Sequence, residues 1–202
     1  MSEKSGLCEP IEHDAIHLCV DMQRLFAEDT DWRTPWMKRV LPRVEEIADA
    51  HTERTVFTRF IPVQSAAEAT GRWRQYWERW RNMTLDCLPE EMVDLVPSLA
   101  HLVPPARVVD KRLYSPWIET PLRALLREHN VQTLVITGAE TDVCVLATVL
   151  GAVDLGFRIV VITDAVCSSS DQTHDALMTL YHQRYSQQVE TATTAEALAA
   201  WR

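Results

Sequence analysis

The sequence predicts an α/β protein in which a parallel sheet lies between two helical layers, a Rossmann-like arrangement. Apolar runs rich in Val and Ile alternate along the chain with longer stretches of helical periodicity. The chain has 202 residues, of which 47% are apolar and 24% are charged, as in ordinary globular proteins. A chain of this length buries a substantial core. We therefore expect one domain over residues 1–202.

The candidate strands are short runs of branched apolar residues, which strands buried on both faces require. Six such runs make up a three-layer α/β/α fold with a six-stranded sheet: 15–21, 55–60, 107–110, 132–137, 158–163 and 188–192. Helical spacing of apolar residues predicts the intervening helices. These are 34–51, 120–129, 143–155, 171–185 and 194–201, and Gly156 fits a left-handed cap after the third of them.

Residues 61–105 interrupt the alternation, because this segment is too long for a plain connection. It is rich in proline and carries an aromatic stripe at helical spacing that includes Trp73 and Trp77. We predict an insertion over the active site. The alternative is a peripheral helix whose aromatic residues belong to the core, and the pattern leaves both open.

Charge and composition exclude several kinds of partner. The formal net charge is -9, so the overall attraction that nucleic acids and anionic membranes require is missing. The first residues form no leader-like apolar stretch, and no later run is long and uncharged enough to cross a bilayer. We expect a cytoplasmic protein that binds neither nucleic acid nor membrane.

The cysteines and glycines argue against common cofactor sites. Five cysteines are scattered along the chain without a paired CxxC spacing, so free thiols are expected. A nucleotide-binding module is the natural rival for this architecture. Neither a GxGxxG turn nor a GxxxxGK[ST] loop can be written with the five glycines present, so we expect no cofactor.

Three polar residues follow predicted strands. Asp21 comes after the first strand, Lys111 after the third, and Cys144 a few residues after the fourth. In an open parallel sheet, catalytic groups gather where the carboxyl ends of the strands meet. We therefore expect Asp21, Lys111 and Cys144 to converge.

The position of Cys144 favours a nucleophile. It follows a sharp turn and falls in the first turn of a predicted helix, where the helix dipole and a nearby Lys ammonium favour the thiolate. Asp21 is then the group that removes the proton. From pattern alone the alternatives stay open: Cys144 as apolar filler, Asp21 as a turn residue and Lys111 as a solvated charge.

Several short motifs occur together in a specific order. They are Val20-Asp21-Met22-Gln23, Thr58-Arg59-Phe60, Val109-Asp110-Lys111-Arg112-Leu113-Tyr114-Ser115, Gly138-Ala139-Glu140-Thr141-Asp142-Val143-Cys144-Val145, residues 148–156 and Thr163-Asp164-Ala165. With these motifs the chain resembles the isochorismatase-like cysteine hydrolases, the group related to N-carbamoylsarcosine amidohydrolase and nicotinamidase, over nearly its whole length.

The resemblance implies a six-stranded parallel sheet, a catalytic triad of Asp21, Lys111 and Cys144, and a homodimer or homotetramer. It also implies a chemistry in which the thiolate attacks a carbonyl-like carbon, an amine leaves, and water releases the acid from a thioester-type intermediate. A cis peptide at Ala139-Glu140 is expected to aim backbone N–H groups at the oxyanion. The expected substrate is a small amide, carbamoyl or ureido compound.

The sequence departs from some members of the group. Nicotinamidases hold a metal with an Asp and two His residues after the second strand, and residues 60–81 contain neither residue type, so a metal site is not expected. Members that cleave the vinyl ether of isochorismate often lack the cysteine, which favours C–N hydrolysis here. An isochorismatase-type hydrolase of another substrate and a catalytically silent binding subunit are the alternatives.

The resemblance also suggests which residues bind the substrate. Phe26 and Tyr114 are expected to line the pocket, with Trp73 or Trp77 from the insertion. Glu140 either binds a substrate ammonium or hydroxyl group or is a carboxylate on a surface turn.

Overall fold

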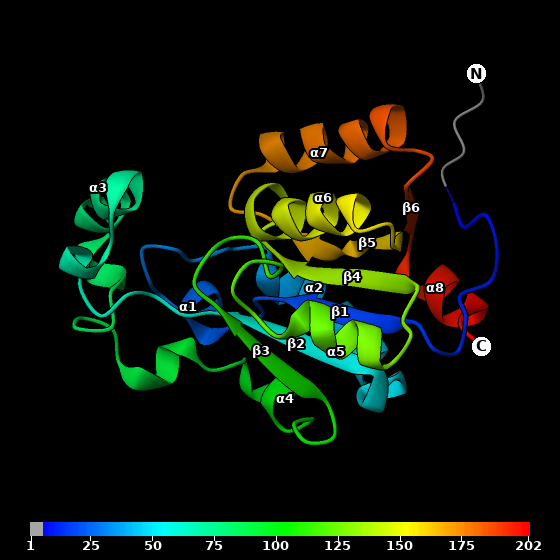
Figure 1. The fold of residues 1–202 in the computed structure, drawn as a ribbon, viewed down its shortest axis with the longest axis horizontal. Helices are drawn as coiled ribbons and strands as arrows, with labels where there is room; N and C mark the ends of the chain where they lie inside the picture. Colours follow the sequence, from blue (N-terminus) through cyan, green and yellow to red (C-terminus); the bar gives the residue numbers. More distant parts are fainter. Residues whose placement is uncertain (1–5) are drawn as a thin grey trace.

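The computed structural model describes residues 6–202 and contains one six-stranded sheet, which is parallel throughout (Figure 1). The strands lie in the order β3-β2-β1-β4-β5-β6. Their bounds are β1 (Ile16–Val20), β2 (Thr55–Phe60), β3 (Arg107–Lys111), β4 (Thr133–Ala139), β5 (Arg158–Cys167) and β6 (Val189–Ala192). All six fall at predicted positions, and the predicted fold class is confirmed.

The alternation of side chains along each strand builds two separate cores. Leu18 in β1 and Leu134 in β4 face one core, while the neighbouring Cys19 and Val135 face the other. Because residues of both clusters are almost fully buried, the strands read in the sequence as continuous apolar runs.

Helices cover both faces of the sheet. The core that contains Cys19 is closed by α2 (Met37–Ala50) and α8 (Thr194–Ala200). The core that contains Leu18 is closed by α5 (Leu122–Glu128), α6 (Leu146–Asp154) and α7 (Asp171–Arg184). Within residues 6–202, no helix combines the length and apolar character that a bilayer crossing requires.

The third predicted helix begins differently from expectation. A single π-helical turn, Thr141–Val145, replaces the first residues of the predicted helix, and regular α6 follows it. Such wide turns are often found at functional sites, where they reposition a side chain. Here the π-helical turn carries Cys144.

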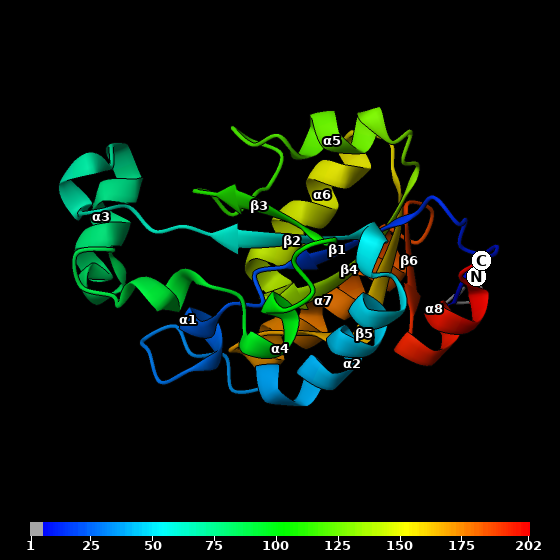
Figure 2. The same cartoon turned by 90° about the horizontal axis from the view of Figure 1, so that it is seen from below.

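The segment 61–105 leads away from the sheet and returns to it. It contains α3 (Gly71–Arg79), α4 (Pro97–Ala100) and three short 3-10 turns, Ala66–Glu68, Arg81–Met83 and Glu90–Val93. Figures 1 and 2 both show α3 at the far end of an arm that leaves β2. The chain before β2 adds α1 (Arg24–Ala27) and the 3-10 turn Thr52–Arg54.

Gly138 allows β4 to approach β1 closely. Its φ angle is 112°, and a Cβ atom on it would lie 2.0 Å from the carbonyl oxygen of Val20. Gly156 also has a positive φ, 83°, but a Cβ atom there would meet nothing within 4 Å. Gly138 therefore meets both a steric and a conformational requirement, whereas Gly156 meets only the second.

His17 links three strands through buried hydrogen bonds. Its ring nitrogens contact Thr55 Oγ1 in β2 at 3.1 Å and Thr137 Oγ1 in β4 at 2.8 Å. Burial, with a smaller contribution from His51, lowers the pKa of His17 to about 3. The folded protein thus requires the neutral imidazole.

We predict that Gly138→Ala destabilises the fold much more than Gly156→Ala does. The strain of a positive φ alone costs about 1–2 kcal/mol. At Gly138 the overlap with Val20 adds to this, so a loss above about 3 kcal/mol is expected. Urea unfolding of the two variants tests the difference, and equal losses would contradict the steric role of Gly138.

We also predict that His17 makes the folded state less stable in acid. Between pH 6.5 and about 3 the unfolded chain binds a proton on His17 that the folded chain does not bind. Stability therefore falls as pH is lowered through this range, by up to about 1.4 kcal/mol per pH unit from this group. Urea unfolding at a series of pH values should give a shallower slope for His17→Gln than for a variant of the exposed His101, His101→Gln.

Candidate active site

Three segments bring Asp21, Lys111 and Cys144 together at the carboxyl edge of the sheet. Asp21 is the first residue after β1, Lys111 is the last residue of β3, and Cys144 lies in the turn after β4. β2 separates β1 from β3, so the long Lys111 side chain reaches across it, with its ammonium 5.1 Å from the centre of the Phe60 ring. Topology thus joins residues that are far apart in the sequence.

The three groups are in direct contact and almost fully buried. Lys111 Nζ lies 2.7 Å from Asp21 Oδ2 and 3.4 Å from Cys144 Sγ. It also donates a hydrogen bond of 3.1 Å to the carbonyl oxygen of Leu113. Asp21 is 0%, Lys111 2% and Cys144 5% exposed. The ammonium therefore joins the carboxylate and the sulfur in one enclosed cluster.

Asp21 is held in place from two sides. Its Oδ1 accepts a hydrogen bond of 2.6 Å from Thr58 Oγ1, and its backbone N–H donates to the carbonyl oxygen of Thr58 at 3.2 Å. Its φ of 49° lies in the left-handed region, which Asp tolerates better than most residues. Oδ1 is thus occupied, and Oδ2 lies against the Lys111 ammonium.

Gln23 fixes the chain just after Asp21. Its amide accepts a hydrogen bond from the backbone N–H of Phe60 at 2.7 Å and donates to the carbonyl oxygens of Phe60, at 3.1 Å, and Val93, at 2.7 Å. This side chain ties the ends of β1 and β2 to the returning arm. The sequence motif contained Gln23, but its positioning role became visible only in the structure.

Lys111 is a buried cation with its charge compensated. Burial lowers the pKa of Lys111, but the charges of Asp21 and Cys144 outweigh it and the net pKa is raised. A buried lysine that keeps its proton requires such partners. Lys111 is therefore an ammonium that stabilises negative charge, not a base.

Cys144 behaves differently from the sequence expectation. Burial raises the pKa of the Cys144 thiol well above its usual range, Lys111 lowers it, and Asp21 raises it further. The sequence predicted that the helix dipole and Lys111 favour the thiolate, and in the folded protein loss of hydration outweighs the effect of the ammonium. At rest the cluster holds a thiol beside a carboxylate.

The turn that carries Cys144 is fixed by its backbone. Two amides, those of Val143 and Val145, donate to the carbonyl oxygen of Glu140 at 3.0 Å each. Thr148 Oγ1 donates to the carbonyl oxygen of Cys144 at 2.7 Å. The Ala139-Glu140 peptide is cis, as the family resemblance implied.

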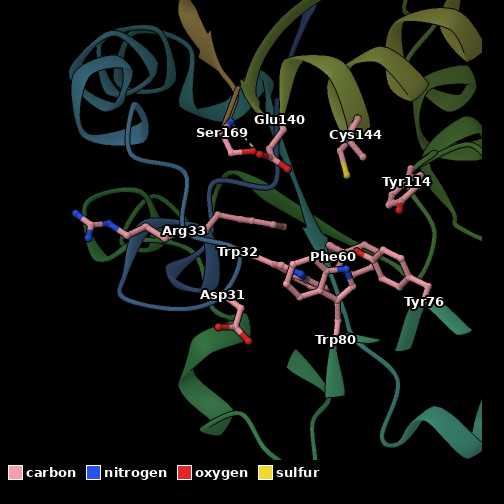
Figure 3. Close-up of a pocket in the computed structure, with 12 residues that line it drawn as sticks. Asp31, Trp32, Arg33, Phe60, Tyr76, Trp80, Tyr114, Glu140, Cys144 and Ser169 are labelled. Atoms are coloured by element: carbon pink, nitrogen blue, oxygen red, sulfur yellow. Dashed lines mark hydrogen bonds between the residues drawn. The ribbon is translucent and has the colours of Figure 1, made fainter. Parts of the chain in front are cut away.

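A cavity of about 280 Å³ opens in front of Cys144 (Figure 3). Aromatic side chains form half of its lining. The lining residues are Phe26, Asp31, Trp32, Arg33, Phe60, Tyr76, Trp80, Tyr114, Glu140, Val143, Cys144 and Ser169. Three residues that the sequence pointed to, Phe26, Tyr114 and Glu140, thus lie around the cavity with Cys144.

Trp73 and Trp77 are not among the lining residues, which corrects the sequence expectation. Trp77 is buried and stacks on Phe60, with 6.0 Å between ring centres, so it supports the cavity from behind. Trp73 packs against Tyr114 at 5.0 Å. These two residues lie four apart and share one stripe of α3.

The adjacent stripe supplies the lining instead, through Tyr76 in α3 and Trp80 directly after the end of α3. Trp32, in the loop after α1, lies within 6.1 Å of both rings. Neither the sequence pattern nor the resemblance pointed to these three residues as substrate-binding. The aromatic periodicity marked the helix, but only the path of the arm decides which stripe faces Cys144.

The described part of the chain places no set of metal-binding side chains near the cluster. Across residues 6–202, no three His, Cys, Asp or Glu side chains are grouped so that they could hold an ion. His174, which lies near the start of α7, contacts Thr141 Oγ1 through Nδ1 at 2.9 Å. Its contact is therefore with the turn that carries Cys144, not with the sulfur.

Comparison with known proteins gives a consistent result. The Isochorismatase domain model matches residues 15–196. A segment of 66 residues is 41% identical to the uncharacterized isochorismatase family protein PncA of Bacillus subtilis, over 33% of this chain and 36% of that protein. The alignment thus spans about a third of the length of that relative.

Solved structures share the fold over nearly the whole chain. A cysteine hydrolase from Pseudomonas syringae pv. phaseolicola 1448A superposes with a TM-score of 0.84 at 21% identity, covering 98% of both chains. N-carbamoylsarcosine amidase from Thermoplasma acidophilum gives 0.71 at 18% identity, covering 92% of this chain and 96% of that one. At such identities the likeness is one of fold.

The contacts of Cys144 predict opposite effects from removing its two charged neighbours. Asp21→Asn removes a charge that raises the thiol pKa, so thiolate should form at lower pH. Lys111→Met removes the ammonium that lowers this pKa, so thiolate should form only at higher pH. Thiolate absorbance is followed against pH in the wild type, Asp21→Asn and Lys111→Met, and the signal of the same protein with Cys144→Ser is subtracted each time. The pH at which thiolate forms should be lowest in Asp21→Asn and highest in Lys111→Met. Equal curves would contradict the coupling of the cluster.

Proposed function

Since the chain belongs to the isochorismatase family of hydrolases, we propose that it cleaves the C–N bond of a small amide, carbamoyl or ureido compound, with Cys144 as the nucleophile. Asp21 is the general base and acid, and Lys111 stabilises the negative charges. No metal takes part in the proposed reaction, because residues 60–81, where nicotinamidases place an Asp and two His ligands, contain neither residue type.

One observation carries the proposal. The Asp21 carboxylate and the Cys144 thiol both lie within 3.4 Å of Lys111 Nζ, and the sulfur faces a cavity large enough for a small substrate. Burying a carboxylate and an ammonium costs free energy, so a contribution to stability does not by itself explain the arrangement. It supplies all groups that a cysteine hydrolase requires: nucleophile, proton acceptor and electrostatic support.

In the first step, the carbonyl carbon of the substrate lies against Sγ of Cys144. Asp21 takes the thiol proton as the sulfur forms a bond to this carbon, so thiolate is generated only when the electrophile is present. This timing suits a thiol whose resting pKa is high. Lys111 remains charged and offsets the negative charge that moves from carboxylate to sulfur to carbonyl oxygen.

The second step breaks the C–N bond. The tetrahedral intermediate collapses to a thioester, and the nitrogen leaves as ammonia or an amine after receiving the proton from Asp21. Asp21, again a carboxylate, then takes a proton from water as the water oxygen attacks the thioester. The acid leaves, the proton returns to the sulfur, and the starting state is restored.

We predict that Cys144→Ala keeps the fold and loses turnover by at least about 10³-fold, because the covalent route is removed. The substrate is first found by screening wild-type protein for ammonia release from carbamoyl amino acids, ureides and simple amides. Circular dichroism of the variant checks the fold. Trapping with acid during turnover should yield an acyl adduct at Cys144 in the wild type.

The remote cysteine Cys87 is exposed and provides the matched control, Cys87→Ala, which should keep full activity. Turnover that survives Cys144→Ala would contradict the mechanism. Failure of the wild type to hydrolyse any compound in the screen would favour a silent binding subunit.

A further inference from the structure

The cavity in front of Cys144 has one charged group directed into it. Of its three charged lining residues, Asp31 and Arg33 are exposed, whereas Glu140 is half-buried. Figure 3 shows the Glu140 carboxylate on the same side as Cys144, while the Arg33 guanidinium extends away from the aromatic rings. A molecule bound beside the sulfur therefore meets a carboxylate.

Neutral groups hold Glu140 and leave its charge uncompensated. Its Oε1 accepts hydrogen bonds from the backbone N–H of Ser169 at 3.0 Å and from Thr34 Oγ1 at 3.5 Å. Within residues 6–202, no Lys, Arg or His side chain forms an ion pair with it. In a partly buried site such a charge favours a cationic ligand more strongly than it would in water.

The wall across from Glu140 is aromatic. Trp32 lies at its centre, with its ring centre 6.0 Å from Phe26, 5.8 Å from Phe60 and 6.1 Å from Trp80. Aromatic faces carry partial negative charge and attract ammonium groups, most strongly methylated ones that shed water easily. Aromatic faces attract hydrated anions only weakly.

Two tyrosine hydroxyls in the lining respond to the same charges. Burial raises the pKa of both Tyr76 and Tyr114, and the charges of Cys144 and Glu140 raise them further. The hydroxyls of Tyr76 and Tyr114 thus lie close enough to Cys144 and Glu140 for both residues to affect them.

We propose that this cavity binds substrates that carry a methylated ammonium group, held by Glu140 and the rings around Trp32 while the carbonyl lies at Cys144. The inference rests on the proposed function, since it names the substrate class of that reaction. A volume of about 280 Å³ equals on the order of nine water volumes, which suits a short-chain compound.

Binding to Cys144→Ala tests this without relying on turnover. Calorimetry compares trimethylammonioacetamide with its neutral isostere, 3,3-dimethylbutanamide, and with the anionic amide succinamate. The homologue of each compound with one more methylene group is measured as well, because the distance from Glu140 to the sulfur decides which chain length fits. The cation should bind at least about tenfold more tightly than the isostere.

Adding Glu140→Gln should remove most of this preference. The amide oxygen of Gln still accepts from Ser169, so the loop keeps its hydrogen bond. Affinity for the cation should fall about tenfold, and that for the isostere should change less than about twofold. Trp80→Leu should weaken cation binding more than isostere binding. Glu53→Gln, an exposed carboxylate in the 3-10 turn before β2, should change neither.

Three results would overturn the inference: equal binding of cation and isostere, no binding of either cation, or tightest binding of succinamate with its loss in Arg33→Gln. The last would assign the cavity to carboxylates. Cation preference without ammonia release by the wild type would leave the binding site in place and refute the hydrolase proposal instead.

Discussion

The site depends on one buried ammonium. Lys111 contacts both Asp21 and Cys144, and its ammonium pairs with the Asp21 carboxylate where almost no water reaches. Removing one partner of such a buried pair leaves an uncompensated charge, which typically costs about 3–5 kcal/mol. In the proposed reaction, the same contact supplies the electrostatic support for a thiolate that forms only when substrate is bound. The position of the Lys111 ammonium therefore matters both for the stability of the site and for the proposed reaction.

Much of the surrounding structure serves to hold this contact. Parallel strands direct Asp21, Lys111 and the turn of Cys144 to one edge, and the close approach at Gly138 sets β4 against β1. Thr58 occupies the other oxygen of Asp21. These interactions use small residues and hydroxyls, because bulky or charged groups would not fit inside a sheet that is buried on both faces.

The arm between β2 and β3 supplies aromatic side chains that cover the cavity in front of Cys144. Parallel strands end in short loops, which by themselves would leave Cys144 facing solvent. Tyr76 in α3 and Trp80 directly after it, together with Trp32 in the loop after α1, close the cavity with aromatic surface. Trp77 behind them is buried and keeps the arm against Phe60. Segments outside the sheet thus supply much of the aromatic lining, whereas Glu140 directly precedes the turn that carries Cys144.

The sequence by itself determined the six strands, the main helices and the identity of the three converging residues. Apolar periodicity reports burial directly, and residues that end parallel strands must share one edge of the sheet. Only the tertiary structure decided the resting state of Cys144 and the stripe of α3 that faces it. A pKa depends on burial and on distances to charges from distant segments, and the orientation of α3 depends on how Trp77 packs. Neither quantity is encoded in local spacing.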